Sequence, residues 1–252
     1  MKAIVGLTAL AMLLTTVAAV ADDPPHATCE VPAYLLATDN KLPKVAEAVK
    51  TDRKLDIMVI GSRSSTITAP DGTGFPGRME ASLRDKLPGV TVNVALQLQV
   101  KKTAEEVTKD IDQLLEGKKP TLVIWQTGTV DAMRSIDPDD FRTAVDEGVA
   151  AMQKAGADVV LINLQYTPRM ETMISTTPYI DIMRVAAQQR EVPLFDRFAI
   201  MHHWNETGSF DLFSAARGVD LAKRVHDCLG RALATFVIDA AQLKPAELRI
   251  QR

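Results

Sequence analysis

Hydrophobic and polar positions change along the chain in a regular pattern. Five short, mostly apolar runs lie at residues 55–60, 90–96, 121–126, 158–165 and 192–198. Between them, apolar residues recur three or four positions apart, which is the spacing of an amphipathic helix. Continuous apolar runs of this length are typical of strands that are covered on both faces. The pattern therefore predicts buried strands that alternate with helices.

Two of the predicted helices have well-marked ends. Residues 103–117 begin with a capping box, in which Thr103 is followed three residues later by Glu106, and they stop at Gly117. A second helix has Asp137 as its N-cap and ends before a glycine. The same spacing predicts further helices at residues 43–50, 76–87, 178–190 and 219–236.

Strands and helices that alternate throughout a chain favour a parallel sheet. Parallel neighbours need right-handed crossover connections, and these place helices on both faces of the sheet. Ligands of such sheets bind beyond the carboxyl ends of the strands. The residues that directly follow each strand are therefore the first candidates for a functional site.

The N-terminus differs in composition from the rest of the chain. Lys2, an apolar run and the small residues Ala19-Val20-Ala21 form the pattern of a secretory signal peptide that is cleaved after Ala21. No later segment has the roughly 18 uninterrupted apolar residues of a spanning helix. The sequence predicts a periplasmic or secreted protein in four segments. These are a signal peptide (1–21), an arm with the first helix (22–54), the main domain (55–240) and a tail (241–252).

Composition excludes some classes of partner. The formal net charge is −3, and loss of the signal peptide removes one positive charge, so nucleic acid is not an expected partner. The clusters of His, Cys and Asp that hold metals are missing from the sequence, and we expect no metal and no cofactor. Two cysteines, Cys29 and Cys228, lie near the two ends of the mature chain. The oxidising compartment to which an exported protein is delivered favours a disulfide between them, and two buried thiols are the alternative.

Several blocks of the sequence resemble one enzyme family. The blocks "IGSRSST", "LVIWQTGT", "AGADVVLINLQY" and "ARGVDLAKRVHDCLGRALA" follow one another as in the SGNH/GDSL hydrolases, in particular their exported bacterial branch. The similarity runs from about Leu55 to Ala234, and "LVIWQTGT" is its most specific element. It implies a three-layer α/β/α, flavodoxin-like domain with a five-stranded parallel sheet and helices on both faces.

The resemblance also implies where a catalytic site would lie. Enzymes of that family resemble one another in four catalytic blocks. A nucleophilic serine follows the first strand, and the oxyanion hole uses a glycine after the second strand and a Gly-x-Asn block after the third. An Asp-x-x-His block at the last helix supplies the base. Aligned without a gap, these positions hold other residue types in this chain. In chain order they are Arg63, Gln97, Val130, Arg217 and Asp220.

The replacements argue against ester hydrolysis. Arg63 stays protonated and is no hydroxyl nucleophile. Val130 offers no donor to an oxyanion, and loss of one such donor typically costs about 100 to 1,000-fold in turnover. Asp220, with a reference pKa of about 3.9, is a poor base near neutrality. The sequence therefore predicts a non-hydrolytic member that binds a small ligand or a protein partner, and a purely structural envelope protein is a third possibility.

An active esterase or deacetylase is the alternative. A one-residue insertion in the first block would return Ser64 to the nucleophile position, and Ser62 is a second candidate. A base would still be needed. The four histidines are His26, His202, His203 and His226. We expect His202 and His203 to serve as scaffold or surface, while His226 lies more than one helical turn beyond Asp220.

Two of the replacements suggest an ion pair. Because the nucleophile and base touch in the family, an unchanged backbone would bring Arg63 against Asp220, with Arg217 one turn away. The pair would either fill a dead cleft or leave arginines available for a small anionic molecule or an envelope component. The candidate ligand-binding residues are Ser62, Arg63, Ser64, Thr129 and Arg217.

Overall fold

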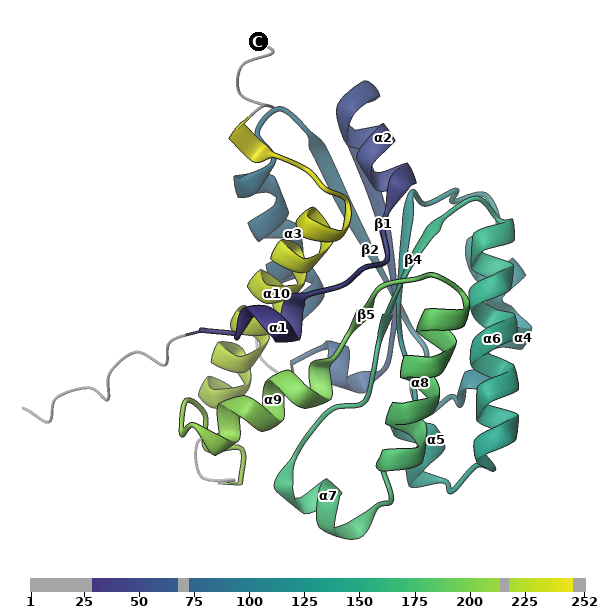
Figure 1. Cartoon of the computed structure of the whole chain (residues 1–252), viewed down its shortest axis with the longest axis vertical. Coiled ribbons are helices and arrows are strands. Elements are labelled where there is room, and N and C mark those ends of the chain that lie inside the picture. Colours follow the sequence, from purple (N-terminus) through teal and green to yellow (C-terminus); the bar gives the residue numbers. More distant parts are fainter. Residues whose placement is uncertain (1–28, 68–72, 214–217, 247–252) are drawn as a thin grey trace, which may run out of the picture.

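A computed structural model describes residues 29–67, 73–213 and 218–246. Its centre is a five-stranded parallel sheet with the strand order β2-β1-β3-β4-β5 (Figure 1). The strands are β1 (Lys54–Gly61), β2 (Thr91–Leu98), β3 (Leu122–Gln126), β4 (Asp158–Ile162) and β5 (Leu194–Phe195). The predicted parallel sheet is confirmed.

Helices cover both faces of this sheet. In Figure 1, α3, α9 and α10 lie on one side, and α4, α6 and α8 lie on the other. The long helices are α2 (Pro43–Thr51), α3 (Phe75–Lys86), α4 (Ala104–Leu115), α6 (Pro138–Lys154), α8 (Thr177–Gln189), α9 (Arg197–Glu206) and α10 (Gly218–Ala240). The short ones are α1 (Ala33–Leu36), the 3-10 helix η1 (Arg63–Ser65), α5 (Thr129–Met133) and α7 (Pro168–Met173).

Side chains of β1 show how the two faces are built. Leu55, Ile57 and Val59 belong to the core beneath α2, α3 and α10. Met58 and Ile60 point to the opposite face and join the core beneath α4, α6 and α8. This alternation follows from the two-residue period of a strand. The predicted three-layer α/β/α, flavodoxin-like fold is confirmed.

The segments on either side of the main domain pack into the same core. Leu42, Val45 and Val49, from the arm and first helix, are fully buried beside β1. Ala241 and Leu243, from the C-terminal tail, belong to the same cluster. The hydrophobic core therefore extends beyond both ends of residues 55–240.

The fifth strand is shorter than its apolar run suggested. It ends at Phe195, because the Asp196 carboxylate accepts a hydrogen bond from the Ala199 amide and caps helix α9. The Asn163 side chain donates to the same carboxylate and accepts from the Phe198 amide, which fixes the turn from strand to helix. Residues 196–198, predicted as strand, therefore begin a helix.

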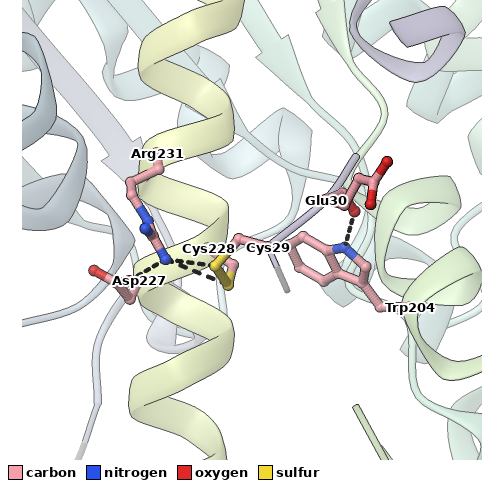
Figure 2. The surroundings of a disulfide bond; sticks show 6 residues. All are labelled: Cys29, Glu30, Trp204, Asp227, Cys228 and Arg231. Atoms are coloured by element: carbon pink, nitrogen blue, oxygen red, sulfur yellow. Dashed lines mark hydrogen bonds and ion pairs between the residues drawn. A yellow bond between two sulfur atoms is a disulfide. The ribbon is translucent and has the colours of Figure 1, made fainter. Parts of the chain in front are cut away.

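The predicted disulfide between Cys29 and Cys228 is present (Figure 2). It joins the N-terminal arm to the middle of α10. Close by, the Trp204 indole nitrogen donates a hydrogen bond of 2.9 Å to the Glu30 carbonyl, which holds the arm against α9. Among the described residues, no helix combines the length and apolar character that membrane spanning requires.

Candidate functional site at the carboxyl edge of the sheet

The chain turns sharply where β1 ends. A Cβ on Gly61 would lie 2.2 Å from the Ser65 hydroxyl oxygen, so only glycine allows the following 3-10 helix to fold back over the strand. This turn buries Ser65 and leaves Ser62 and Ser64 half-buried. Arg63 points outward and is exposed. Arg63, which the ungapped alignment put at the nucleophile position, therefore faces solvent, and the serines face the sheet.

A glutamine at the end of β3 connects the three serines. The Gln126 amide nitrogen donates to the Ser62 hydroxyl at 3.1 Å and to the Ser64 hydroxyl at 2.7 Å. Its carbonyl oxygen accepts from the Ser65 hydroxyl at 2.6 Å. Gln126 is only 5% exposed, so these bonds satisfy a buried amide and hold the serines at one place.

Arg197, the first residue of α9, brings a buried cation to Ser64. Its Nη1 lies 3.2 Å from the Ser64 hydroxyl, and Nη2 lies 3.3 Å from the Ser64 carbonyl and 3.5 Å from the Gln165 side-chain oxygen. The guanidinium also lies 5.6 Å from the centre of the Phe75 ring. Arg197 is 2% exposed, and burial lowers its pKa to about 10.

This cation is incompletely compensated. In the part of the chain that the structure describes, no carboxylate lies within ion-pair distance of Arg197, and its Nε atom has no hydrogen-bond partner. Buried charges in proteins are usually paired or bound to a ligand, because desolvation without a partner is costly. A buried arginine with only neutral partners is therefore a candidate for the binding of an anion.

His226 also packs against Phe75 and serves a structural role. Its Nδ1 accepts a hydrogen bond of 2.9 Å from the Phe75 amide, at the N-terminus of α3, and the two rings are stacked. Burial, followed by the charges of Arg197 and Arg78, lowers the pKa of His226 to about 3. Its neutral ring acts as an N-cap, so the Nδ1 lone pair is already used.

The low pKa of His226 predicts a pH effect on stability. The unfolded ring binds a proton below its reference pKa of about 6.5, whereas the folded ring stays neutral down to about 3. The contribution of the neutral His226 ring to the free energy of unfolding is complete above pH 6.5. It is lost as the pH falls toward 3, at up to about 1.4 kcal/mol per pH unit. His226→Asn keeps an acceptor for Phe75 without titrating. Urea denaturation should show a shallower pH dependence in the variant, and equal slopes would contradict the prediction.

A small hollow adjoins the serines. It has room on the order of one water molecule and is bordered by Ser62, Gln126, Thr129, Val130 and by eight neighbours. The eight are Ile60, Gly61, Gln99, Lys102, Val107, Thr127, Gly128 and Asp131. After the end of β2, the residue that borders the hollow is Gln99. The alignment had pointed to Gln97, two residues earlier.

Asp131, in the wall of this hollow, is buried. Its Oδ1 accepts from the Ala104 amide at the N-terminus of α4, while Oδ2 has no hydrogen-bond partner among the residues that the structure describes. Burial raises the pKa of this carboxyl. It orients α4 against α5, and among the described residues no hydrogen bond joins it to Ser62 or Ser64.

The expected ion pair between Arg63 and Asp220 is not found among the described residues. Both side chains are exposed, because the turn after Gly61 directs Arg63 outward and Asp220 lies on the solvent side of the first turn of α10. Arg217, expected beside them, lies outside the described residues, as does His26. The proposed plug of the cleft is therefore absent from the described structure.

The other histidines lie away from the serines. His202 pairs with Glu206 one turn along α9 and packs edge-on against Tyr166. His203, beside it, is half-buried. For the residues with described positions, no hydrogen bond joins a histidine to Ser62 or Ser64. The Ser64 hydroxyl thus receives two donors, and no imidazole of the described residues accepts its proton.

Sequence reasoning missed the two residues that organise this site. Gln126 was counted as the end of an apolar strand, and Arg197 was placed inside the fifth strand. Both carried a signal, since each is a polar residue at the end of an otherwise apolar run. Such interruptions mark the carboxyl edge of a parallel sheet, where ligands bind.

Comparison with known proteins identifies the family. Residues 28–243 match the model of the non-GDSL lipase-like family, and the chain belongs to that family. Its resemblance to the SGNH/GDSL hydrolases is thereby confirmed. No curated protein matches the chain.

Solved structures show the same fold at low sequence identity. A lipase/acylhydrolase from Enterococcus faecalis is 18% identical with a TM-score of 0.59, and the match covers 76% of this chain and 98% of that one. A catalytic mutant of an acetylxylan esterase from Geobacillus stearothermophilus is 16% identical with a TM-score of 0.58, covering 72% and 94%. At such identities the likeness extends to the fold and leaves the activity to be argued from the site.

Proposed function

We propose that this protein is a pseudoenzyme of the non-GDSL lipase-like family that binds a small anionic molecule at the carboxyl edge of its sheet. The observation that carries the proposal is the buried guanidinium of Arg197, which reaches Ser64 and has no carboxylate within ion-pair distance in the described structure. The predicted signal peptide places this function in the periplasm or outside the cell. Mass spectrometry that finds Asp22 at the mature N-terminus would support export, and an intact Met1 would contradict it.

The site supplies donors and positive charge for an anion. Ser62 and Ser64 are half-buried, so their hydroxyls can be reached from solvent and can donate to a carboxylate or phosphate oxygen. Arg197 lies behind them in a region of low dielectric, where its charge acts more strongly than at the surface. The exposed Arg63 adds a second cation at the rim. A bound anion would offset part of the cost of burying Arg197.

The same contacts give the esterase alternative its only specific support. Gln126 and Arg197 both donate to the Ser64 hydroxyl, and such donors would stabilise an alkoxide at this atom. The fold is also that of known esterases. Acyl transfer further requires a base for the serine proton, and none of the described histidines stands beside it.

Anion binding is tested by thermal shift. We expect acetate, succinate or phosphate to raise the melting temperature of the protein, because a ligand that binds only the folded state adds about 2.7 kcal/mol at 100 times its Kd. Arg197→Met removes the charge while keeping a long apolar side chain and should abolish the shift. Arg63→Ala should weaken it. Arg142→Met, on the solvent face of α6, is the control and should respond as the unmodified protein does.

Equal stabilisation of the unmodified protein and Arg197→Met by these anions would overturn the proposed site.

The esterase alternative is tested separately with a short-chain aryl ester. We expect the same background hydrolysis from the unmodified protein and from Ser64→Ala. Turnover that disappears in Ser64→Ala would establish the enzyme and refute the pseudoenzyme.

A further inference from the structure

A cationic pocket lies beside the disulfide, between α3 and α10. It has a volume of about 340 Å³ and is lined by Cys29 and Cys228 together with five charged side chains, Arg78, Lys223, Arg224, Asp227 and Arg231. Four of these are basic and one is acidic, whereas the chain as a whole has a net charge of −3. The contrast marks this pocket as a site for an anionic group.

The architecture of α10 builds the pocket. Arg224, Cys228 and Arg231 recur at helical spacing and share one face of the helix. Gly230 lets α3 approach closely, since a Cβ there would lie 2.5 Å from the Arg78 Cβ. Arg78 thereby joins the wall from the neighbouring helix. The site is made of side chains from two packed helices and of the disulfide itself.

One cation touches the disulfide directly. The Arg231 Nη2 atom lies 2.5 Å from the Cys29 sulfur and 3.9 Å from the Cys228 sulfur (Figure 2). Asp227 pairs with the same nitrogen at 2.7 Å, which orients the guanidinium and offsets part of its charge. Cys29 is half-buried, whereas Cys228 is only 2% exposed. Of the two cysteines that line the pocket, Cys29 is therefore the more exposed.

We propose that this pocket is a thiol–disulfide exchange site for small anionic thiols. The thiolate of the incoming molecule attacks the Cys29 sulfur, and a new disulfide forms between them. The Cys29–Cys228 bond breaks, and Cys228 leaves as a thiolate, so one thiolate is consumed and one is produced. Nearby cations favour this exchange because they stabilise the thiolate that leaves.

The positive pocket selects the reaction partner by charge. It raises the local concentration of an anionic thiol, and steering of this kind typically changes association rates by 10-fold or more. The product carries a mixed disulfide on Cys29 and a free thiolate on Cys228. The exchange therefore breaks the covalent link between the N-terminal arm and α10, while the hydrogen bond from Trp204 to Glu30 remains.

Three thiols of different charge test the proposal on the intact protein. Opening of the disulfide is followed by acid quenching, alkylation and mass spectrometry with 2-mercaptoethanesulfonate (anionic), 2-mercaptoethanol (neutral) and cysteamine (cationic). Each rate is divided by the rate with the same thiol and a small neutral disulfide. We expect a preference of about 10-fold for the anionic thiol over the neutral one, with the first adduct on Cys29. Ethanesulfonate, which has no thiol, should compete.

Matched variants locate the effect. Arg231→Gln and Arg224→Gln should reduce the preference for the anionic thiol, whereas Arg142→Gln, whose arginine pairs with Asp139 on α6, should keep it. Equal normalised rates for the three thiols would overturn the proposal, as would an equal loss of preference in Arg142→Gln or a first adduct on Cys228. Arg197→Met should leave the preference unchanged, so failure here is distinguishable from failure of the proposed anion site.

Discussion

Replacement of both Cys29 and Cys228 by serine is expected to lower the melting temperature by about 10 °C or more. The bridge joins residues 199 positions apart, and a loop of this length corresponds to about 5 kcal/mol in the chain-entropy model. For a domain of this size, each kcal/mol shifts the melting temperature by about 2–4 °C. Calorimetry of the two proteins measures the difference.

Reduction of the unmodified protein provides the control for this experiment. It removes the same cross-link without changing the sequence, so it should reproduce most of the loss in melting temperature. The single variant Cys29→Ser should behave similarly, because it also prevents the bridge. A melting temperature that stays the same after complete reduction would show that the bond does not stabilise the fold.

Gly230→Ala is expected to destabilise the protein by about 2 kcal/mol. A Cβ at this position would lie 2.7 Å from the backbone nitrogen of Met79 and 2.9 Å from the carbonyl carbon of Arg78. Backbone atoms cannot rotate away as a flexible side chain can, so α3 has to shift against α10. That shift disturbs the buried Met79, and its cost exceeds the gain of about 1 kcal/mol from helix propensity.

Gly218→Ala, in the same helix, is the matched control. No atom of the described residues lies within 4 Å of a Cβ at this position, so we expect its stability to stay within about 0.5 kcal/mol of that of the unmodified protein. Urea denaturation of both variants gives the comparison. If Gly230→Ala were as stable as Gly218→Ala, the close contact between α3 and α10 would not limit the fold.

The buried positive charge of the candidate site comes from a residue that the alignment did not select. Family resemblance places a nucleophile at Arg63, yet the structure turns this side chain to solvent and brings Arg197 to Ser64 from another element. A guanidinium stays protonated at working pH, even with the pKa lowered to about 10, and so binds anions without accepting protons. The arrangement therefore supports the proposed binding of an acidic ligand.

Local patterns in the sequence were sufficient for the five strands and for the long helices other than α9, in their observed order. Thr103 and Glu106 form the predicted capping box at the start of α4, and Asp137 caps α6 through the Asp139 amide. The apolar run of β1 predicted a strand buried on both faces. These features depend on residues a few positions apart, so a single stretch of sequence contains the physical information that decides them.

Element ends and side-chain partners required the tertiary structure. The apolar run at 192–198 is compatible with strand throughout, and only the contact between Asn163 and Asp196 shows where α9 begins. His226 has no local signal for its low pKa, which arises from burial and from arginines on other helices.

By itself, the sequence determined a parallel α/β fold and a pair of cysteines suited to bonding, and it predicted changed residues at the family's signature positions. Only the tertiary structure decided that Arg63 faces solvent, that Gln126 gathers the serines and that Arg197 supplies a buried cation. The physical reason is the distance along the chain over which each kind of interaction acts. Periodicity and capping act between neighbours in the chain, whereas a site is formed by side chains that are distant in sequence and meet only when the helices pack on the sheet.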